Sequence, residues 1–150
     1  MQPLSIRPAK DADLEDFLSL AEAIGKVSGV WGNDPRSDFY SYLKEMKEGK
    51  IIFLLAIFEE KIVGFSTVKL FKRLVPSEFD PKSCTIGVAV HPNYRRQGVG
   101  TQLIEYGLKE AKKRGIENIA MQKIAEKLGF IKYAVLERDG WKFPRYKRKI

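Results

Sequence analysis

The sequence predicts a single α/β domain in which a mixed sheet carries helices on its faces. A length of 150 residues suits one domain, here residues 1–150. The composition, 44% hydrophobic and 31% charged, is typical of globular proteins. Segments with one-sided helical periodicity also alternate with short runs rich in strand formers, which is the pattern of a sheet flanked by helices.

Two helices are predicted in the first third of the chain. Asp11 is expected to cap a helix that ends at Gly25 and repeats its apolar residues on one face. The pair Asp34-Pro35 has the order of a cap and a first helical turn, and the apolar repeat behind it runs to Gly49.

The middle of the chain reads as strands. Ile51–Phe58 and Ile62–Lys72 flank the turn residues 59–61 and predict a hairpin of central strands. The proline-containing segment Leu74–Ser83 is expected to be an exposed loop, and Cys84–His91 is again strand-like.

The last third predicts two helices and a hairpin. Gly98–Arg114 has helical spacing with basic residues in its last turn. Asn118 is expected to cap a short helix that closes at Gly129. Phe130–Arg138 and Trp141–Lys149 then flank Asp139-Gly140, a typical hairpin turn.

Composition narrows the possible functions. No run approaches the ~18 apolar residues of a membrane span, and the first ten residues lack the order of a signal peptide, so a cytoplasmic protein without membrane contact is expected. Cys84 and His91 are the only cysteine and histidine, which excludes a disulfide framework and a zinc cluster; no metal is expected. The net charge of +8 favours an anionic ligand.

The segment from Val88 to Thr101 carries the chemistry. A strand leads through a polar turn into a helix that starts with Gly98 and Gly100. Free N–H groups at a helix start, glycines that admit a close anion and the charges of Arg95 and Arg96 together suit a pyrophosphate. A phosphate-binding P-loop is excluded because no Gly-Lys-Ser or Gly-Lys-Thr follows, and the dinucleotide fingerprint is excluded because Leu103 stands where a small residue is needed.

This segment resembles the acyl-CoA signature of the GNAT superfamily of N-acetyltransferases. The family pattern Gln/Arg-x-x-Gly-x-Gly/Ala is matched by residues 95–100, Arg-Arg-Gln-Gly-Val-Gly. The preceding Val-x-Val strand, His91-Pro92, the Glu-Lys-Leu-Gly-Phe of residues 126–130 and the Ile-Val-Gly of residues 62–64 also resemble the family. The resemblance implies a mostly antiparallel sheet and acetyl-CoA as co-substrate.

The resemblance also implies how acetyl-CoA is held. Backbone amides from Arg96 to Thr101 would bind the pyrophosphate, and Ala89 and Val90 would pair with the pantetheine as with an added strand. An amine would attack the thioester directly, with a backbone N–H near Val90 stabilising the oxyanion. The residues assigned to acetyl-CoA are Val88, Ala89, Val90, Arg95, Arg96, Gln97, Gly98, Val99, Gly100, Thr101 and Asn118.

No catalytic residue is assigned from the sequence. The strand Cys84–His91 lacks the carboxylate that the family often uses as a base, and Ala125 stands where its acid, a tyrosine, is usual. The candidates that remain are Glu78, Asp80, His91 and Tyr133. We expect Glu78 and Asp80 to be loop charges, His91 to serve its turn, Tyr133 to pack in the core and Cys84 to be a buried apolar residue.

The resemblance implies an amine as the acceptor, but the sequence does not identify which one: a protein N-terminus and a small-molecule amine both stay open. Residues 118–127 look like the helix of the branch that acetylates the amino termini of ribosomal proteins, and Val27–Asn33, with Trp31, suits a lid over the acceptor. One alternative is a CoA-binding regulatory protein with weak catalysis. Another is nucleic-acid binding through residues 141–149, where basic and aromatic side chains interleave; the two-residue period of an edge strand accounts for that pattern, so nucleic acid is not the expected partner.

One feature departs from the resemblance. The family has a full fifth strand before its last helix, but only Ile116 and Glu117 separate the two predicted helices here. The fifth strand is therefore expected to be shortened or missing, through loss of the strand or through absence of about nine residues from this sequence. A lost strand would expose the edge of the Cys84–His91 strand, which a homodimer would cover.

Overall fold

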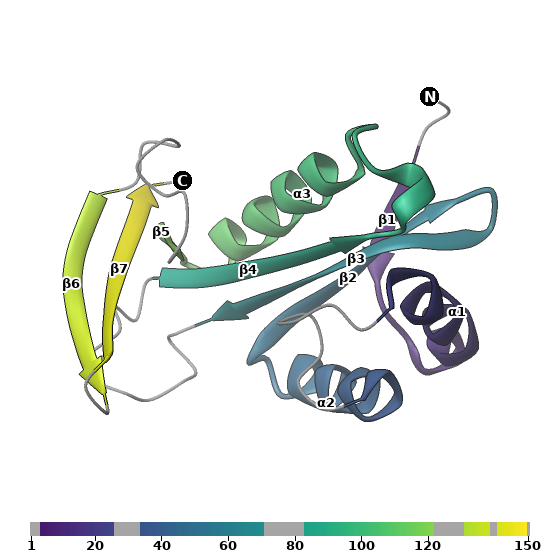
Figure 1. The fold of residues 1–150 in the computed structure, drawn as a ribbon, viewed down its shortest axis with the longest axis horizontal. Helices are drawn as coiled ribbons and strands as arrows, with labels where there is room; N and C mark the ends of the chain where they lie inside the picture. The colour runs from purple at the N-terminus through teal and green to yellow at the C-terminus, as the bar shows by residue number, and fades with distance from the viewer. Residues whose placement is uncertain (1–3, 26–33, 71–82, 122–130, 139–140, 150) are drawn as a thin grey trace.

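The computed structural model forms one sheet with helices on both faces (Figure 1). It describes residues 4–25, 34–70, 83–121, 131–138 and 141–149, with side chains up to Glu117. Within these residues seven strands lie in the order β1-β2-β3-β4-β5-β7-β6, and every neighbouring pair is antiparallel except β4 and β5. The predicted α/β class and mostly antiparallel sheet are confirmed.

The two predicted helices that end at Gly25 and Gly49, the predicted helix that begins at Gly98 and most predicted strands are present. The elements are β1 (Ser5–Pro8), the 3-10 turn η1 (Asp11–Asp13), α1 (Leu14–Ile24), α2 (Pro35–Lys47), β2 (Ile51–Phe58), β3 (Lys61–Leu70), β4 (Ser83–Val90), the 3-10 turn η3 (Pro92–Tyr94), α3 (Val99–Lys113), β5 (Asn118–Met121), β6 (Ile131–Arg138) and β7 (Trp141–Lys149). The strand β1 was not predicted, because four residues carry too little of a two-residue pattern.

The start of α1 is held by a different residue from the predicted Asp11. Asp13 accepts a hydrogen bond from the Lys10 N–H (2.9 Å) and two from the Arg7 guanidinium (2.8 Å each). Arg7 lies in β1, so this ion pair fastens the edge strand to the first helix. The predicted cap of α2 is confirmed, since the Asp34 carboxylate accepts from the Ser37 N–H at 3.0 Å.

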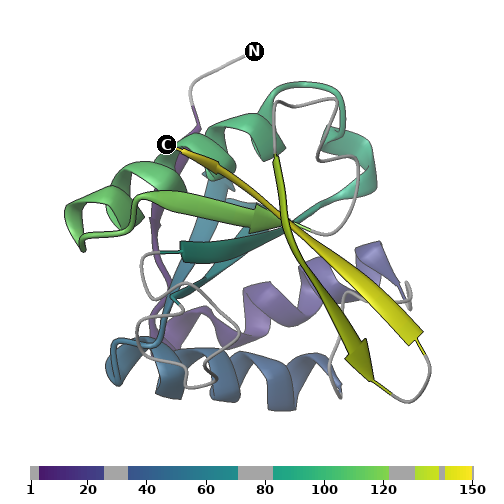
Figure 2. The same cartoon turned by 90° about the vertical axis from the view of Figure 1, so that its left-hand side faces the viewer.

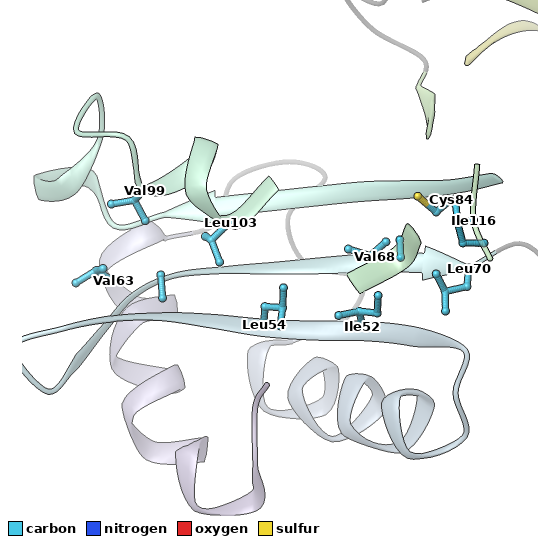
Figure 3. Packing of buried hydrophobic residues seen from close by; sticks show 11 residues of the cluster. Ile52, Leu54, Val63, Val68, Leu70, Cys84, Val99, Leu103 and Ile116 are labelled. Carbon is cyan, nitrogen blue, oxygen red and sulfur yellow. The ribbon is translucent and has the colours of Figure 1, made fainter. Parts of the chain in front are cut away.

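The core has two halves, one on each face of the sheet. Side chains of β2, β3 and β4 pack against α3 on one face, as Figure 3 shows for Leu54, Val68 and Leu103. Aromatic residues of α1, α2 and the sheet fill the other face, with Phe17 at the centre. The helix α3 lies close to the sheet because Gly107 has no side chain: a Cβ there would stand 3.0 Å from Val68 Cγ2.

The fifth strand corrects the predicted helix after Asn118. Residues 118–121 form β5, which pairs in parallel with β4 only through Ser83–Asn118 and Cys84–Ile119, and antiparallel with β7. The apolar spacing that predicted the helix begins only at Met121, whereas residues 118–121 pair with strands on both edges. A shortened strand is confirmed and a missing strand is wrong; the remainder of the predicted helix, residues 122–129, lies outside the described residues.

Two further expectations fall outside the described residues, namely the lid at 27–33 and most of the loop at 74–83. Among the helices that are described, none combines the length and apolar character needed to cross a bilayer.

Candidate active site

The strand β4 has an open edge along most of its length. Its pairing with β5 ends at Cys84, and no described strand lies against the same side of the six residues from Thr85 to Val90. In Figure 1, β5 lies beside the start of β4, while the other end of β4 leads to η3 and the start of α3. Figure 2, in which the left-hand side of Figure 1 faces the viewer, shows the β6–β7 hairpin in front of the rest of the sheet.

The register of β3 and β4 determines which backbone groups face that open edge. The His91 N–H donates to the Val63 carbonyl at 2.8 Å, so these two residues form a hydrogen-bonded pair. Such pairs recur at every second residue of an antiparallel ladder, which turns the backbone groups of Ala89 toward Phe65 and those of Val88 and Val90 toward the open edge. This register turns the Ala89 backbone away from the edge where the pantetheine was predicted to pair. The Val88 backbone groups and the Val90 N–H face that edge, and the Val90 carbonyl accepts from Arg95 Nε.

The turn after β4 brings the chain into α3 with an uncapped helix start. Arg96 has φ +61° and Gly98 has φ +86°, both in the left-handed region. The first helical hydrogen bond runs from the Gln102 N–H to the Gly98 carbonyl (3.0 Å), and no side chain caps Gly98. The N–H groups of the next three residues, 99–101, thus have no partner within the helix and point out of its positive end, an arrangement suited to an anion.

The open edge and the helix start are adjacent. A Cβ built on Gly100 would lie 3.6 Å from Val88 Cγ1 and 3.7 Å from Val90 Cγ2. A ligand that pairs with the β4 edge therefore runs directly to the N–H groups at the start of α3. The predicted residues from Val88 to Thr101 are brought together in one place, with Ala89 turned toward β3.

The polar side chains of the turn mostly support its backbone. Arg95 Nε donates to the Val90 carbonyl at 3.1 Å, and Gln97 Nε2 donates to the Asn93 carbonyl at 3.3 Å. His91 Nδ1 accepts from the Asn93 N–H at 3.0 Å, and its ring stands edge-on to Tyr94 with centroids 5.3 Å apart. The prediction that His91 serves the turn is confirmed by these contacts.

Cys84 is buried and unreactive by environment. Its side chain has no exposed surface, and burial raises the pKa of the thiol to about 12. A thiol that stays protonated at neutral pH is not a nucleophile. The prediction that Cys84 packs as an apolar strand residue is confirmed.

Of the other predicted residues, the structure places Asn118 away from the site. Asn118 lies in β5 and pairs with Ser83, at the opposite end of β4 from Val90. The seven residue steps from Ser83 to Val90 span roughly 23 Å along an extended strand. Glu78, Asp80, Trp31 and Ala125 lie outside the described residues, and of Tyr133 only its place in β6 is described. Across the described ranges, no group of three His, Cys, Asp or Glu side chains is placed to hold a metal ion.

The chain is similar to known acetyltransferases. The model of the acetyltransferase (GNAT) family matches residues 14–130. An N-alpha-acetyltransferase of Saccharolobus solfataricus is 28% identical over 118 residues, which are 66% of this chain and 68% of the relative.

Solved structures share the fold. An N-acetyltransferase from Staphylococcus aureus Mu50 superposes with a TM-score of 0.71 at 19% identity, covering 99% of both chains. The ribosomal-protein-alanine N-acetyltransferase of Brucella melitensis gives 0.70 at 21% identity, covering 97% of this chain and 99% of that one. The PaiA N-acetyltransferase of Thermoplasma acidophilum, solved with coenzyme A, gives 0.68 at 19% identity over 99% of this chain and 100% of that one. Because the family model spans most of the sequence, including the open β4 edge and the uncapped start of α3, this chain belongs to the GNAT family of acetyltransferases.

Proposed function

We propose that this protein transfers the acetyl group of acetyl-CoA to the α-amino group of a protein or peptide. Acetyl transfer to an amine is the general chemistry of the family. The observation that carries the proposal is the continuous path from the open edge of β4 to the uncapped N–H groups of α3. A linear ligand with amides in one part and a pyrophosphate in another fits both parts of this path.

Each part of that path has a role in binding acetyl-CoA. The N–H groups from Arg96 to Thr101 bind the pyrophosphate, and the exposed Arg95 and Arg96 side chains add positive charge. The edge N–H and carbonyl of Val88 and the N–H of Val90 pair with the pantetheine amides as a neighbouring strand would, and the Val90 carbonyl stays with Arg95 Nε. These contacts need backbone groups, which is consistent with the small and apolar side chains of β4.

The chemical step is a direct displacement. The amine nitrogen forms a bond to the carbonyl carbon of the thioester and loses a proton, the carbon–sulfur bond breaks, and coenzyme A leaves as a thiolate that takes up a proton to become the thiol. An N–H group on the β4 edge near Val90 donates to the carbonyl oxygen as negative charge develops on it. One such donor typically lowers the barrier by ~3 kcal/mol.

The side chains around the edge favour an acceptor that loses its proton readily. The sequence of β4, from Ser83 to Val90, contains no carboxylate, and His91 Nδ1 is engaged by the Asn93 N–H. An α-amino group has a pKa of about 7.7 to 8.0 and a lysine side chain about 10.4, so near neutral pH roughly a tenth of the former and less than a thousandth of the latter is unprotonated. Among the described residues, this edge of β4 thus carries no strong base, which favours an α-amine.

The names of two relatives agree with this acceptor class. The S. solfataricus relative is an N-alpha-acetyltransferase, and the B. melitensis structure is a ribosomal-protein-alanine N-acetyltransferase. We use these names as support for testing peptide N-termini first.

The test is release of free coenzyme A from acetyl-CoA in the presence of matched peptides. One peptide carries a free N-terminus and no lysine, and its control is N-terminally blocked and carries one internal lysine. We expect turnover with the first peptide only. Turnover with the blocked peptide alone would contradict the α-amine assignment, and binding of acetyl-CoA without turnover of any amine would favour a regulatory CoA-binding protein.

A further inference from the structure

The peptide bond that joins Val90 to His91 is held from both sides. Its carbonyl accepts from Arg95 Nε at 3.1 Å, and its N–H donates to the Val63 carbonyl at 2.8 Å. This peptide is the last of the β4 ladder, at the point where the open edge passes into the turn before α3. The orientation of this peptide therefore sets the position of the last backbone groups on the open edge of β4.

The contact of Arg95 is made by the nitrogen nearest the backbone. A guanidinium carries five N–H groups in a rigid plane, and Nε provides one of them. The other four have no partner in the part of the chain that the structure describes, and the side chain is exposed beside the start of α3. The Arg95 side chain therefore binds the end of β4 through Nε and leaves its other N–H donors free for an anion at the start of α3.

We propose that Arg95 is a positioning residue for acetyl transfer, fixing the Val90 peptide at the end of the open edge and linking it to the anion bound at the start of α3. The inference rests on the proposed function. A carbonyl on an open strand edge has no ladder partner, so without the Nε–H donor it would turn to water and the strand end would fray. Small displacements of a bound reactant are costly for the rate, because the reacting atoms must stay close and aligned.

The neighbouring Arg96 provides a matched comparison. It has the same charge and is also exposed, but it occupies a left-handed backbone position (φ +61°) and has no hydrogen bond to β4 among the described residues. Its contribution to an anion is that of charge. Arg95 and Arg96 therefore separate the effect of position from the effect of charge.

The experiment compares R95K, R95Q and R96Q by steady-state kinetics with acetyl-CoA and the free N-terminal peptide. Lysine retains the charge but lacks the planar fork that lets one nitrogen bind the strand while others face the anion. We expect R95K to lower kcat about ten-fold with the KM for acetyl-CoA nearly unchanged. R96Q should raise that KM with kcat nearly unchanged, and R95Q should do both.

Two results would overturn the inference. Restoration of the wild-type kcat in R95K, or the same pattern of kcat and KM in R95Q and R96Q, would mean that Arg95 acts through charge alone.

A second measurement does not depend on turnover. In a ¹⁵N NMR spectrum of the wild-type protein, the Arg95 Nε–H signal, assigned by its disappearance in R95K, should exchange slowly with water. Fast exchange would show that the bond to Val90 is absent in solution and would also overturn the inference. If the wild-type protein fails to bind acetyl-CoA in calorimetry, both the proposed function and the positioning role are wrong. If the wild-type protein binds acetyl-CoA and catalyses transfer, and R95K has the same kcat, only the positioning role is wrong.

Discussion

Substitution of Gly100 separates ligand binding from folding at the start of α3. A Cβ at this position makes ordinary contacts of 3.6 and 3.7 Å with the side chains of Val88 and Val90, so the fold has room for it. Gly100 lies within the first turn of α3, where glycine is a poorer helix former than alanine or valine by roughly 0.4 to 1 kcal/mol. Gly100→Ala should therefore leave the melting temperature unchanged or slightly higher, and thermal denaturation checks whether the larger Gly100→Val variant keeps the fold.

The same Cβ lies where the first turn of α3 meets the Val88 and Val90 side chains, beside the helix N–H groups to which acetyl-CoA is proposed to bind. Valine adds two methyl groups there and should displace the pyrophosphate from at least two charge-assisted N–H bonds. With about 1.5 kcal/mol for each bond, the loss is about 3 kcal/mol, or an increase in Kd of roughly 100-fold.

Isothermal titration calorimetry with CoA measures this effect, and circular dichroism on heating checks the fold. Lys109→Val, on the exposed surface of the same helix, controls for a new β-branched residue and should bind CoA normally. Unchanged CoA affinity in a folded Gly100→Val variant would refute the assigned site.

Three other predictions follow from the structure. The rate of acetyl transfer should rise with pH toward the pKa of the acceptor amine. Four single substitutions should each lower kcat less than ten-fold: Glu78→Gln, Asp80→Asn, His91→Ala and Tyr133→Phe. A loss of ~10³-fold in any of them would identify a dedicated catalytic residue. Ser66 is fully buried with an unpaired hydroxyl, so Ser66→Ala should stabilise the protein by about 1 kcal/mol, or 2 to 4 °C in thermal denaturation; a lower melting temperature would be inconsistent with an unpaired hydroxyl. The hydrogen bonds from Arg7 hold the pKa of Asp13 below its ordinary value of 3.8, so the carboxylate stabilises the fold above about pH 4 and that contribution disappears as the pH falls through the lowered pKa. Urea denaturation of Asp13→Asn should show a loss of about 1.5 kcal/mol at pH 7 that vanishes in acid; a loss independent of pH would contradict the ion pair.

The helices and long strands could be predicted because local signals agree there with tertiary packing. Asp34 and Pro35 fix the start of α2, and a continuous apolar run over Ile51–Phe58 marks a strand covered on both faces. The turn of this hairpin formed although Glu59 and Glu60 both have positive φ, a conformation in which glycine or asparagine is usual. Pairing of eight residues in β2 outweighs the strain of those two.

The sequence failed where pairing between distant segments decides the structure. Residues 118–121 were predicted as a helix start because helical apolar spacing follows from Met121 onward, yet partners on β4 and β7 make them a strand. For the same reason Asn118 was assigned to the acetyl-CoA site and is found at the other end of β4. A four-residue strand such as β1 carries no reliable local signal at all.

The candidate site was predictable in outline and not in detail. The glycine spacing and the following helix predict an anion site at residues 95–101, and the structure shows an uncapped helix start there. Which of Ala89 and Val90 faces the open edge depends on the phase of the β3–β4 ladder, which the sequence of β4 alone does not contain. The bond from Arg95 to Val90 likewise depends on the turn conformation, in which Arg96 has φ +61°.

The most direct test of the proposed acetyl-CoA site is hydrogen–deuterium exchange of the backbone with and without acetyl-CoA. Binding should slow exchange at the amides of Val88 and Val90 and at those from Arg96 to Thr101, while the β1–β2 region and the exposed face of α2 stay unchanged. Protection confined to other segments, or no protection at saturating acetyl-CoA, would contradict the assignment of the ligand to the β4 edge and the start of α3.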